Sequence, residues 1–293
     1  MAILGILRGV ASLIFLAVNT TFWGSLIFIT TFFRLIIPLK KWGVLCGKAA
    51  VFFAENWVNF NNFGLILTRN MEFELEGVEA LDRKGWYLVI SNHQSWVDIP
   101  ILQKVFYHKI PFLKFFLKKE LIWVPLLGQA WWALDFPFMK RYSPAFLKKK
   151  PHLKGKDIEI TRKACEKFKD MPVSVMNFIE GTRFRDDKHE RQKSPYKNLL
   201  RPKAGGIGFV LSAMGDQLDY ILDVTISYPN GAQEFWAFMC GNIKKVTVKV
   251  EKIPITDEIL GDYTEDKEHR IKFQRWLNSV WTRKDEYLEG LKA

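Results

Sequence analysis

A histidine and an aspartate five positions apart, His93 and Asp98, are the residues of this chain best placed to do chemistry. Imidazole accepts a proton near neutral pH, and a carboxylate on one ring nitrogen leaves the other nitrogen free to act as a base. No Gly-x-Ser-x-Gly motif or cysteine in a catalytic setting accompanies the pair. The base would therefore activate a substrate hydroxyl directly, which typically accelerates a reaction by about 10²–10⁴-fold.

The spacing alone is not specific, because the sequence contains it a second time, from His152 to Asp157. That second copy begins in a lysine-rich polar stretch with no apolar run before it. His93, in contrast, follows the apolar run 86–90 and precedes a helical pattern over 96–106. A residue at the end of a buried strand lies where α/β folds place their chemistry, so this context selects His93.

Helix geometry restricts how His93 and Asp98 can meet. Residues five apart on a regular helix point about 140° apart, so we expect His93 in the turn before the helix and Asp98 in its first turn. Ser95 is the expected N-cap, which places Asp98 at the third helical position, as in a capping box. A purely structural capping role for Asp98 is therefore an alternative, and the two roles are compatible because a carboxylate accepts several hydrogen bonds.

A second polar cluster follows another apolar run, residues 172–179, and consists of Glu180, Gly181, Thr182 and Arg183. A guanidinium group holds phosphate with two hydrogen bonds, so Arg183 is a candidate phosphate ligand. Thr182 adds a hydroxyl donor, and Glu180 is placed to hold a substrate hydroxyl or to orient Arg183. The alternative is an ion pair between Glu180 and Arg183 on the surface. Both clusters follow buried strands, so we expect them to face one cleft.

Lys140 and Arg141 are further candidates for phosphate binding. They follow a short apolar run at 135–139, which predicts a strand that ends at these two cations. The alternative is that they are simply the solvated exit of that strand.

Composition favours a membrane partner. The chain has 293 residues, 48% of them hydrophobic, and a net charge of +12, which favours an anionic partner. The 24 phenylalanines and 11 tryptophans concentrate in apolar stretches, and no zinc-finger or RNA-binding signature is present, which argues against nucleic acid. The histidines lack metal-ligand spacing, so no metal or other cofactor is expected. Three scattered cysteines fit a reducing compartment.

The amino-terminal stretch 9–33 contains no charged residue and is long enough to cross a bilayer. It lacks a signal-peptide cleavage site. Three basic residues within 34–41 outnumber Arg8 on the other flank, so a spanning helix would leave the rest of the chain on the cytoplasmic side. Polar residues at 19–21 lower the hydropathy, and a shallow or re-entrant helix is the alternative.

The chain divides into a membrane-anchoring part, 1–70, and an α/β part, 71–293. Residues 42–68 have the pattern of an amphipathic helix in the membrane interface, or of a helix packed on the α/β part. Beyond them, strands alternate with helices, which predicts the α/β class. We expect strands at 72–76, 85–90, 135–139, 172–179, 220–228 and 246–251, and helices at 96–106, 129–133, 157–169, 204–214 and 264–291.

Four blocks of residues, in order and with matching spacing over about 86–228, resemble the PlsC-type glycerolipid (lysophosphatidic acid) acyltransferase family. These blocks are Asn92-His93-x4-Asp98, Lys119-Glu120-x4-Pro125-x2-Gly128, Phe138-x2-Arg141 and Phe178-x-Glu180-Gly181-Thr182-Arg183. Each block alone is weak evidence, whereas four in order are specific.

The resemblance implies a mixed sheet flanked by helices and a membrane-bound acyltransferase. Such an enzyme moves an acyl chain from a thioester, acyl-CoA or acyl carrier protein, to the hydroxyl of a lysophospholipid. It implies His93 as the base, Asp98 as its partner, and Glu180, Gly181, Thr182 and Arg183 as the acceptor phosphate site. Within the family the likeness is greatest to a bacterial membrane enzyme, which implies the inner membrane with the catalytic part on the cytoplasmic side.

Three departures leave the acceptor open. Phe184 stands where the family has a small residue, the block Val224-Thr225-Ile226 lacks a proline, and the segment 184–203 is long, as in the branch with lysocardiolipin acyltransferases. A thioester hydrolase that activates water and a non-catalytic lipid-binding protein are the alternative functions. The apolar residues from Leu126 to Phe136, with Trp131 and Trp132 foremost, are predicted to line the acyl channel or to anchor the domain at the bilayer interface.

Overall fold

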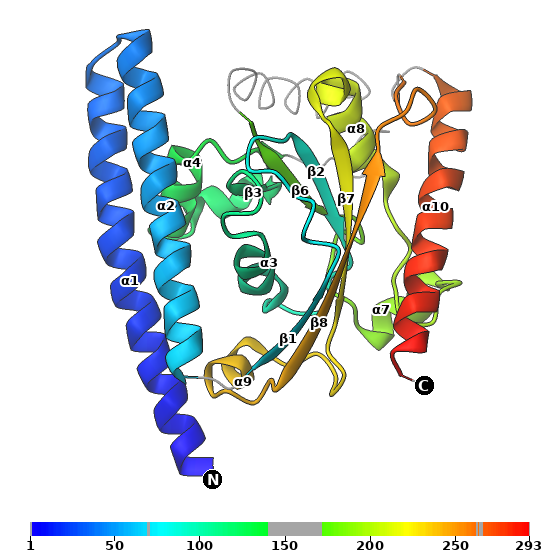
Figure 1. The fold of residues 1–293 in the computed structure, drawn as a ribbon, viewed down its shortest axis with the longest axis horizontal. Coiled ribbons are helices and arrows are strands. Elements are labelled where there is room, and N and C mark those ends of the chain that lie inside the picture. Colours follow the sequence, from blue (N-terminus) through cyan, green and yellow to red (C-terminus); the bar gives the residue numbers. More distant parts are fainter. Residues whose placement is uncertain (1, 69–70, 140–171, 262, 264–265, 293) are drawn as a thin grey trace.

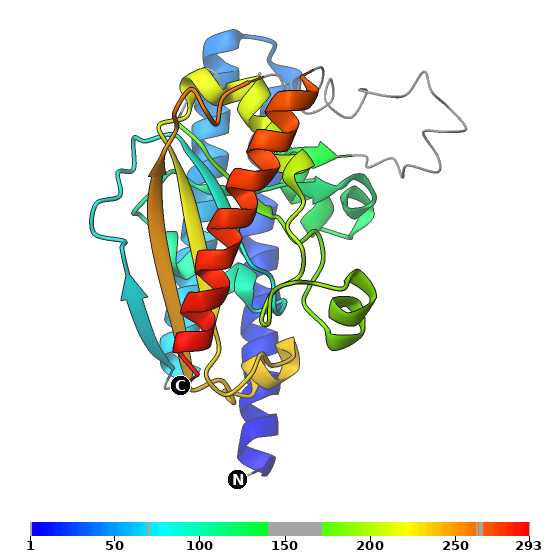
Figure 2. The same ribbon diagram turned by 90° about the vertical axis from the view of Figure 1, so that its right-hand side faces the viewer.

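The computed structural model describes residues 2–68, 71–139, 172–261, 263 and 266–292. A hairpin of two long helices lies on one side of a central sheet, and a carboxy-terminal helix lies across its other face (Figure 1; Figure 2). The expected helix at 157–169, the basic stretch 148–156, and both Lys140 and Arg141 fall outside the described residues.

The central sheet has six strands in the order β1-β8-β7-β2-β6-β3. Neighbours β7, β2, β6 and β3 run parallel, β8 is antiparallel to β7, and β1 is parallel to β8. The sheet is therefore mixed, as expected. Its strands are β1 Glu72–Glu76, β2 Tyr87–Ser91, β3 Leu113–Phe115, β6 Ser174–Phe178, β7 Tyr220–Ser227 and β8 Lys245–Pro254. A separate parallel pair joins β4 Leu117–Lys118 to β5 Phe138–Met139.

Helices cover both faces of this sheet. They are α3 Asp98–Phe106, α4 Leu127–Ala133, α7 Asp186–Gln192, α8 Ala204–Met214, α9 Phe235–Met239 and α10 Lys267–Gly290, with 3₁₀ turns at Lys119–Trp123 and Gly215–Gln217. The short helices α7 and α9 were not expected, because α7 is wholly polar and α9 wholly apolar, so neither shows a helical period in its few turns. The expected strand 135–139 is shorter, because Asp135 takes a positive φ of 57° in the turn before it.

Strand β2 is buried on both faces and divides the interior into two cores. Tyr87 and Val89 belong to the core under α3, whereas Leu88 and Ile90 belong to the core under α8 and α10. This alternation follows from the two-residue period of a strand. A parallel strand covered by helices on both sides is apolar throughout, which explains the continuous apolar run in the sequence.

The amino-terminal helices α1 (Ala2–Ile36) and α2 (Lys40–Thr68) form an antiparallel hairpin. Asn19 Nδ2 donates to Trp57 O at 3.0 Å and to Asn61 Oδ1 at 2.8 Å. Trp57 Nε1 donates to Thr20 Oγ1 at 3.0 Å. Asn19 and Thr20, two of the polar residues that lower the hydropathy of α1, therefore find hydrogen-bond partners on α2. Among the described helices, only α1 is long and apolar enough to cross a membrane, judged by length and composition.

One face of α2 packs inward. Its buried residues recur every four positions and are small or β-branched: Cys46, Ala50, Ala54 and Val58. Ala50 and Ala54 join the core that also contains α3. Two ion pairs tie the hairpin to the rest of the chain, Arg34 with Asp135 at 2.9 Å and Glu55 with Arg83 at 2.6 Å. Helix α2 thus packs on the α/β part, as one of the two sequence interpretations predicts.

A fully buried lysine fastens α10 to the sheet. Lys284 Nζ donates to Val224 O at 2.6 Å and to Thr225 Oγ1 at 3.0 Å, and it lies 2.9 Å from Asp223 Oδ1. Burial lowers the pKa of Lys284 and raises that of Asp223, and the charge of each partner opposes the shift. A buried charge is tolerated only when it is paired, so each of these two residues needs the other.

Replacing Asp223 with alanine should therefore destabilise the protein by about 3–5 kcal/mol, because the Lys284 charge stays buried without its anion. Denaturant unfolding in detergent micelles measures the loss. Lys197→Ala is the matched control, because it breaks an exposed ion pair with Glu289 at 3.2 Å and should leave stability unchanged within error. Equal stability of the Asp223→Ala variant and the control would contradict the assignment.

Candidate active site

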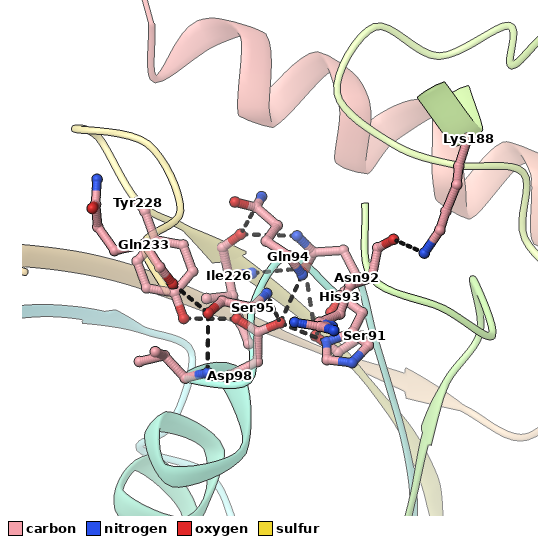
Figure 3. Close-up of polar contacts among 12 residues, drawn as sticks. Ser91, Asn92, His93, Gln94, Ser95, Asp98, Lys188, Ile226, Tyr228 and Gln233 are labelled. Carbon is pink, nitrogen blue, oxygen red and sulfur yellow. Dashed lines mark hydrogen bonds and ion pairs between the residues drawn. The ribbon is translucent and has the colours of Figure 1, made fainter. Parts of the chain in front are cut away.

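The side chain of Asn92, which precedes His93, binds the backbone of β7. Asn92 Oδ1 accepts from Ile226 N and Nδ2 donates to Ile226 O, both at 2.9 Å. Gln94 Nε2 also donates to Ile226 O, at 3.2 Å. These bonds continue the pairing of β2 with β7 beyond the last strand residue, so the backbone turns at a fixed point and directs His93 away from the strand (Figure 3).

The Asp98 carboxylate accepts four hydrogen bonds and is fully buried. Its Oδ2 accepts from His93 Nδ1 at 2.8 Å, Gln94 N at 2.7 Å and Ser95 N at 3.0 Å. Its Oδ1 accepts from Tyr228 Oη at 2.7 Å. A carboxylate in this setting can only accept, so the proton of a neutral His93 belongs on Nδ1. Among the described residues no group bonds to Nε2, which is left with its lone pair.

The helix start differs from the sequence expectation. Helix α3 begins at Asp98 with Val97 as N-cap, so the assignment of Ser95 as N-cap is wrong. The Ser95 hydroxyl accepts from Val97 N at 3.2 Å and donates to Gln233 O at 2.6 Å. These two bonds hold Ser95 in the turn that precedes α3. The Asp98 carboxylate still bonds Ser95 N, so local capping and the contact with His93 coexist.

The His93 ring is fixed from the neighbouring strand. Phe178 at the end of β6 stacks on it, with ring centroids 3.9 Å apart and an interplanar angle of 14°. Phe184 N donates to His93 O at 2.7 Å, which joins the loop after β6 to the His93 turn. The side chain is 12% exposed, so one edge of the ring reaches the surface.

Glu180 lies beneath this turn and is fully buried. Among the described residues, no group meets hydrogen-bond geometry with either carboxyl oxygen, although the backbones of His93 and Leu200 lie close to the carboxyl group. Burial raises the pKa of Glu180 well above its ordinary value and the charge of Asp98 adds to the rise, while backbone groups of His93 and Leu200 and the charge of Lys284 offset part of it. A surface ion pair between Glu180 and Arg183 is therefore excluded by the position of Glu180.

The rest of the second cluster lies nearer the surface. Gly181 adopts a positive φ of 71°, which favours glycine, and its N–H donates to Phe178 O at 2.9 Å. This turn directs Thr182 and Arg183 outward. The Arg183 guanidinium lies over the Trp96 ring, 5.0 Å from its centroid. Both strand-end clusters thus lie close to His93.

The sequence gives no signal for three residues that complete this arrangement: Tyr228, Phe178 as a stacking partner, and Lys188. Lys188 Nζ, on α7, donates to Thr182 Oγ1 at 2.6 Å and to Arg183 O at 3.2 Å. Tyr228 is 130 positions from Asp98, so only the fold brings the two together. Among the described residues, no group of three or more His, Cys, Asp or Glu could hold a metal ion.

The apolar stretch from Leu126 to Phe136 does not form one lining. Leu126 and Trp132 are 52% and 45% exposed, whereas Leu134 and Phe136 are buried in the core. The exposed tryptophan favours the interface-anchor interpretation of this stretch over the channel interpretation.

Comparisons with known proteins agree with the geometry. A family model described as Acyltransferase matches residues 72–228. The chain is 24% identical over 239 residues to a 2-acyl-1-lysophosphatidylinositol acyltransferase of Saccharomyces cerevisiae, covering 69% of this chain and 60% of that protein. It is 23% identical over 217 residues to 1-acyl-sn-glycerol-3-phosphate acyltransferase 3 of Arabidopsis thaliana, covering 67% and 54%. The chain thus spans little more than half the length of these relatives.

A solved structure shares the fold. The crystal structure of the 1-acyl-sn-glycerophosphate acyltransferase PlsC from Thermotoga maritima matches with a TM-score of 0.59 at 18% identity. The match covers 98% of this chain and 97% of that one, so it includes the helical hairpin as well as the sheet.

The raised pKa of Glu180 predicts how stability depends on pH. Above the ordinary glutamate value of 4.5, the folded protein retains a proton that the unfolded chain releases, so stability falls as the pH rises toward the native pKa. Glutamine at position 180 removes this titration. We expect the Tm of Glu180→Gln, relative to that of the unmodified protein, to increase as the pH is raised from 4.5.

Thermal unfolding in detergent across this pH range measures the difference. Glu190→Gln removes one exposed carboxylate of α7 and is the control for loss of a negative charge. If the difference in Tm between Glu180→Gln and the unmodified protein stays constant across this pH range, Glu180 does not titrate in this way.

Proposed function

Because this chain belongs to the acyltransferase family whose model covers more than half of it, we propose that it transfers a fatty acyl chain from an acyl thioester to the free hydroxyl of a lysophospholipid. The observation that carries this proposal is the His93–Asp98 contact of 2.8 Å, with Nε2 bound by no described residue. A histidine held in this way is a general base aimed at the surface of the protein.

In the proposed reaction, His93 Nε2 takes the proton of the acceptor hydroxyl as its oxygen attacks the thioester carbonyl carbon. The ester bond forms, the carbon–sulfur bond breaks, and the departing thiolate takes the proton back from the imidazolium. The Asp98 carboxylate stabilises the imidazolium and keeps the ring oriented. Its three other donors hold the carboxylate in place while the charge on the ring changes.

Direct attack by the acceptor is favoured over an acyl-enzyme. The two serines flanking the turn donate their protons to backbone carbonyls, Ser91 to Asn92 O at 3.0 Å and Ser95 to Gln233 O at 2.6 Å. Neither hydroxyl is presented to His93, so neither is prepared as a nucleophile. The substrate must therefore supply the hydroxyl that His93 deprotonates.

Gly181, Thr182 and Arg183 are proposed to hold the acceptor phosphate. Among the described residues no carboxylate pairs with Arg183, whose guanidinium is available to an anion above Trp96. Glu180 is proposed to support the His93 turn from below rather than to contact substrate, because it is fully buried. Lys140 and Arg141, outside the described residues, remain proposed as further phosphate ligands.

The names of the relatives indicate which class of acceptor to test. One is named for a lysophosphatidylinositol and another for 1-acyl-glycerol 3-phosphate, and both acceptors are phosphorylated lysolipids. Acyl-CoA and acyl carrier protein are both proposed donors. The second candidate function is thioester hydrolysis, in which His93 activates water. Acyl transfer requires the acceptor for thioester consumption, whereas hydrolysis consumes the thioester without it. A non-catalytic lipid-binding role would leave the thioester intact.

The hairpin is proposed to attach the protein to a membrane, with residues 1–70 as anchor and 71–293 as catalytic part. Helix α1 presents a continuous apolar surface to the outside, which includes Ile3, Leu7, Val10, Ile14, Val18, Phe22, Ile29 and Phe33. An exposed apolar surface of this length fits a lipid environment. We propose that this membrane is the bacterial inner membrane, with the catalytic part on the cytoplasmic side, and that the protein is similar to a bacterial membrane acyltransferase.

His93→Ala should abolish acyl transfer while the protein remains folded, because the acceptor hydroxyl loses its base. The expected loss in kcat is about 10²–10⁴-fold, measured with labelled acyl-CoA and lysophosphatidic acid. His269→Ala, on α10, is the control for loss of a histidine elsewhere. Retention of more than about a tenth of the rate by His93→Ala, below the general-base range, would rule out this mechanism.

Membrane attachment should survive high salt, because burial of the apolar surface of α1 does not depend on charge screening. Washing of membranes with concentrated salt, followed by sedimentation, measures this. Aspartate at the exposed positions Val18 and Phe22 should weaken attachment, since a charge is costly in hydrocarbon. Ile271→Asp, an exposed site on α10, is the control. Release of the unmodified protein by salt alone would refute the anchor.

A further inference from the structure

We propose that Lys188 is a second cation of the acceptor site and, together with Arg183, selects a phosphate monoester over a phosphodiester. This inference rests on the proposed function and names the headgroup class that the site prefers. Three observations carry it: the position of Lys188, the absence of a carboxylate partner for it among the described residues, and its link to the His93 turn.

The position of Lys188 is fixed by the loop that it contacts. Its Nζ donates to Thr182 Oγ1 at 2.6 Å and to Arg183 O at 3.2 Å, which leaves a third N–H for a ligand. Phe184 N donates to His93 O at 2.7 Å, and Phe184 directly follows Arg183. The ammonium group, the guanidinium and the imidazole thus belong to one tightly connected loop system.

Among the described residues, no carboxylate forms an ion pair with Lys188. The nearby carboxylate of Asp187 is held by Arg185 at 2.7 Å, on the exposed side of α7. Partial burial lowers the pKa of Lys188, and the like charges of Arg185, Arg183 and Arg191 lower it further, while the charge of Asp187 acts in the opposite direction. The like charges around Lys188 repel one another, and binding of an anion at this place would relieve that repulsion.

The charge of the site matches a phosphate monoester. A monoester carries about −1.5 to −2 charges at pH 7, whereas the diester of a larger headgroup carries a single charge. Arg183 alone satisfies one negative charge through its two parallel donors. Lys188 supplies the second charge, so its removal should weaken binding of the monoester more than binding of the diester.

The alternative is a structural role, in which Lys188 only stabilises the loop at Thr182. Two substitutions distinguish these roles: Lys188→Met removes the charge and keeps the stem, and Lys188→Arg keeps the charge. Lys197→Met removes an exposed lysine paired with Glu289 and is the matched control. All variants are made in the full chain, in mixed micelles, and their Tm values are compared.

The first measurement compares KM for lysophosphatidic acid, lysophosphatidylglycerol and acyl-CoA. Lys188→Met should raise KM for lysophosphatidic acid about 10- to 100-fold, the usual effect of a lost charged hydrogen bond. The rise for the diester should be much smaller, and KM for acyl-CoA should not change. Lys188→Arg should recover most of the loss, and Lys197→Met should behave as the unmodified protein.

An unchanged KM for lysophosphatidic acid in Lys188→Met would overturn the inference and leave the proposed function standing. Equal rises for both acceptors would overturn the selection of monoesters. A lowered Tm together with equal rises in KM for the acceptor and for acyl-CoA would show that Lys188 has only the structural role and would overturn the inference.

A binding measurement separates the inference from the activity. Calorimetric titration with sn-glycerol 3-phosphate should show weaker binding to Lys188→Met than to the unmodified protein. If this difference appears in a protein that transfers no acyl chain to any lysolipid, the proposed function fails and the phosphate site stands. Equal binding by both proteins would overturn the site.

Discussion

The buried carboxylate of Asp98 is the interaction on which the rest of the site depends. A charge removed from water is tolerated only when hydrogen bonds replace its solvation, and here four donors do so. Three come from the turn after β2, and the fourth comes from Tyr228, just beyond β7. A single side chain therefore fixes the His93 turn, the start of α3 and the end of β7 in one arrangement.

A layer of buried titratable side chains lies around and below this turn. Asp98, Glu180, Asp223 and Lys284 are all fully or nearly fully buried, and only the last two form an ion pair. Lys284 reaches this layer from α10, so the carboxy-terminal helix helps to hold the site in place as well as packing on the sheet. The charge of Lys284 also acts on Glu180, whose raised pKa marks it as the least compensated member. The site is thus supported from the face of the sheet opposite the hairpin.

Sequence patterns predict the parts of this structure that depend on local chemistry. The apolar runs identify β2, β6 and β7, and helix geometry predicts how His93 reaches Asp98. Prediction fails where a distant group decides the outcome. Gln233 O draws the Ser95 hydroxyl away from the expected cap, and the burial of Glu180 depends on packing that the motif itself does not record. Lys188 lies on a helix too short to be recognised, so nothing local marks it as a neighbour of Thr182.

The central claim is that Asp98 acts on the reaction through His93. A double-mutant cycle in kcat, with His93→Ala, Asp98→Asn and the two combined, tests it most directly. If Asp98 acts only by holding the imidazole, the double variant should be as slow as His93→Ala alone, because no ring remains to orient. If the two losses multiply in the double variant, Asp98 acts independently of His93 and the account is contradicted.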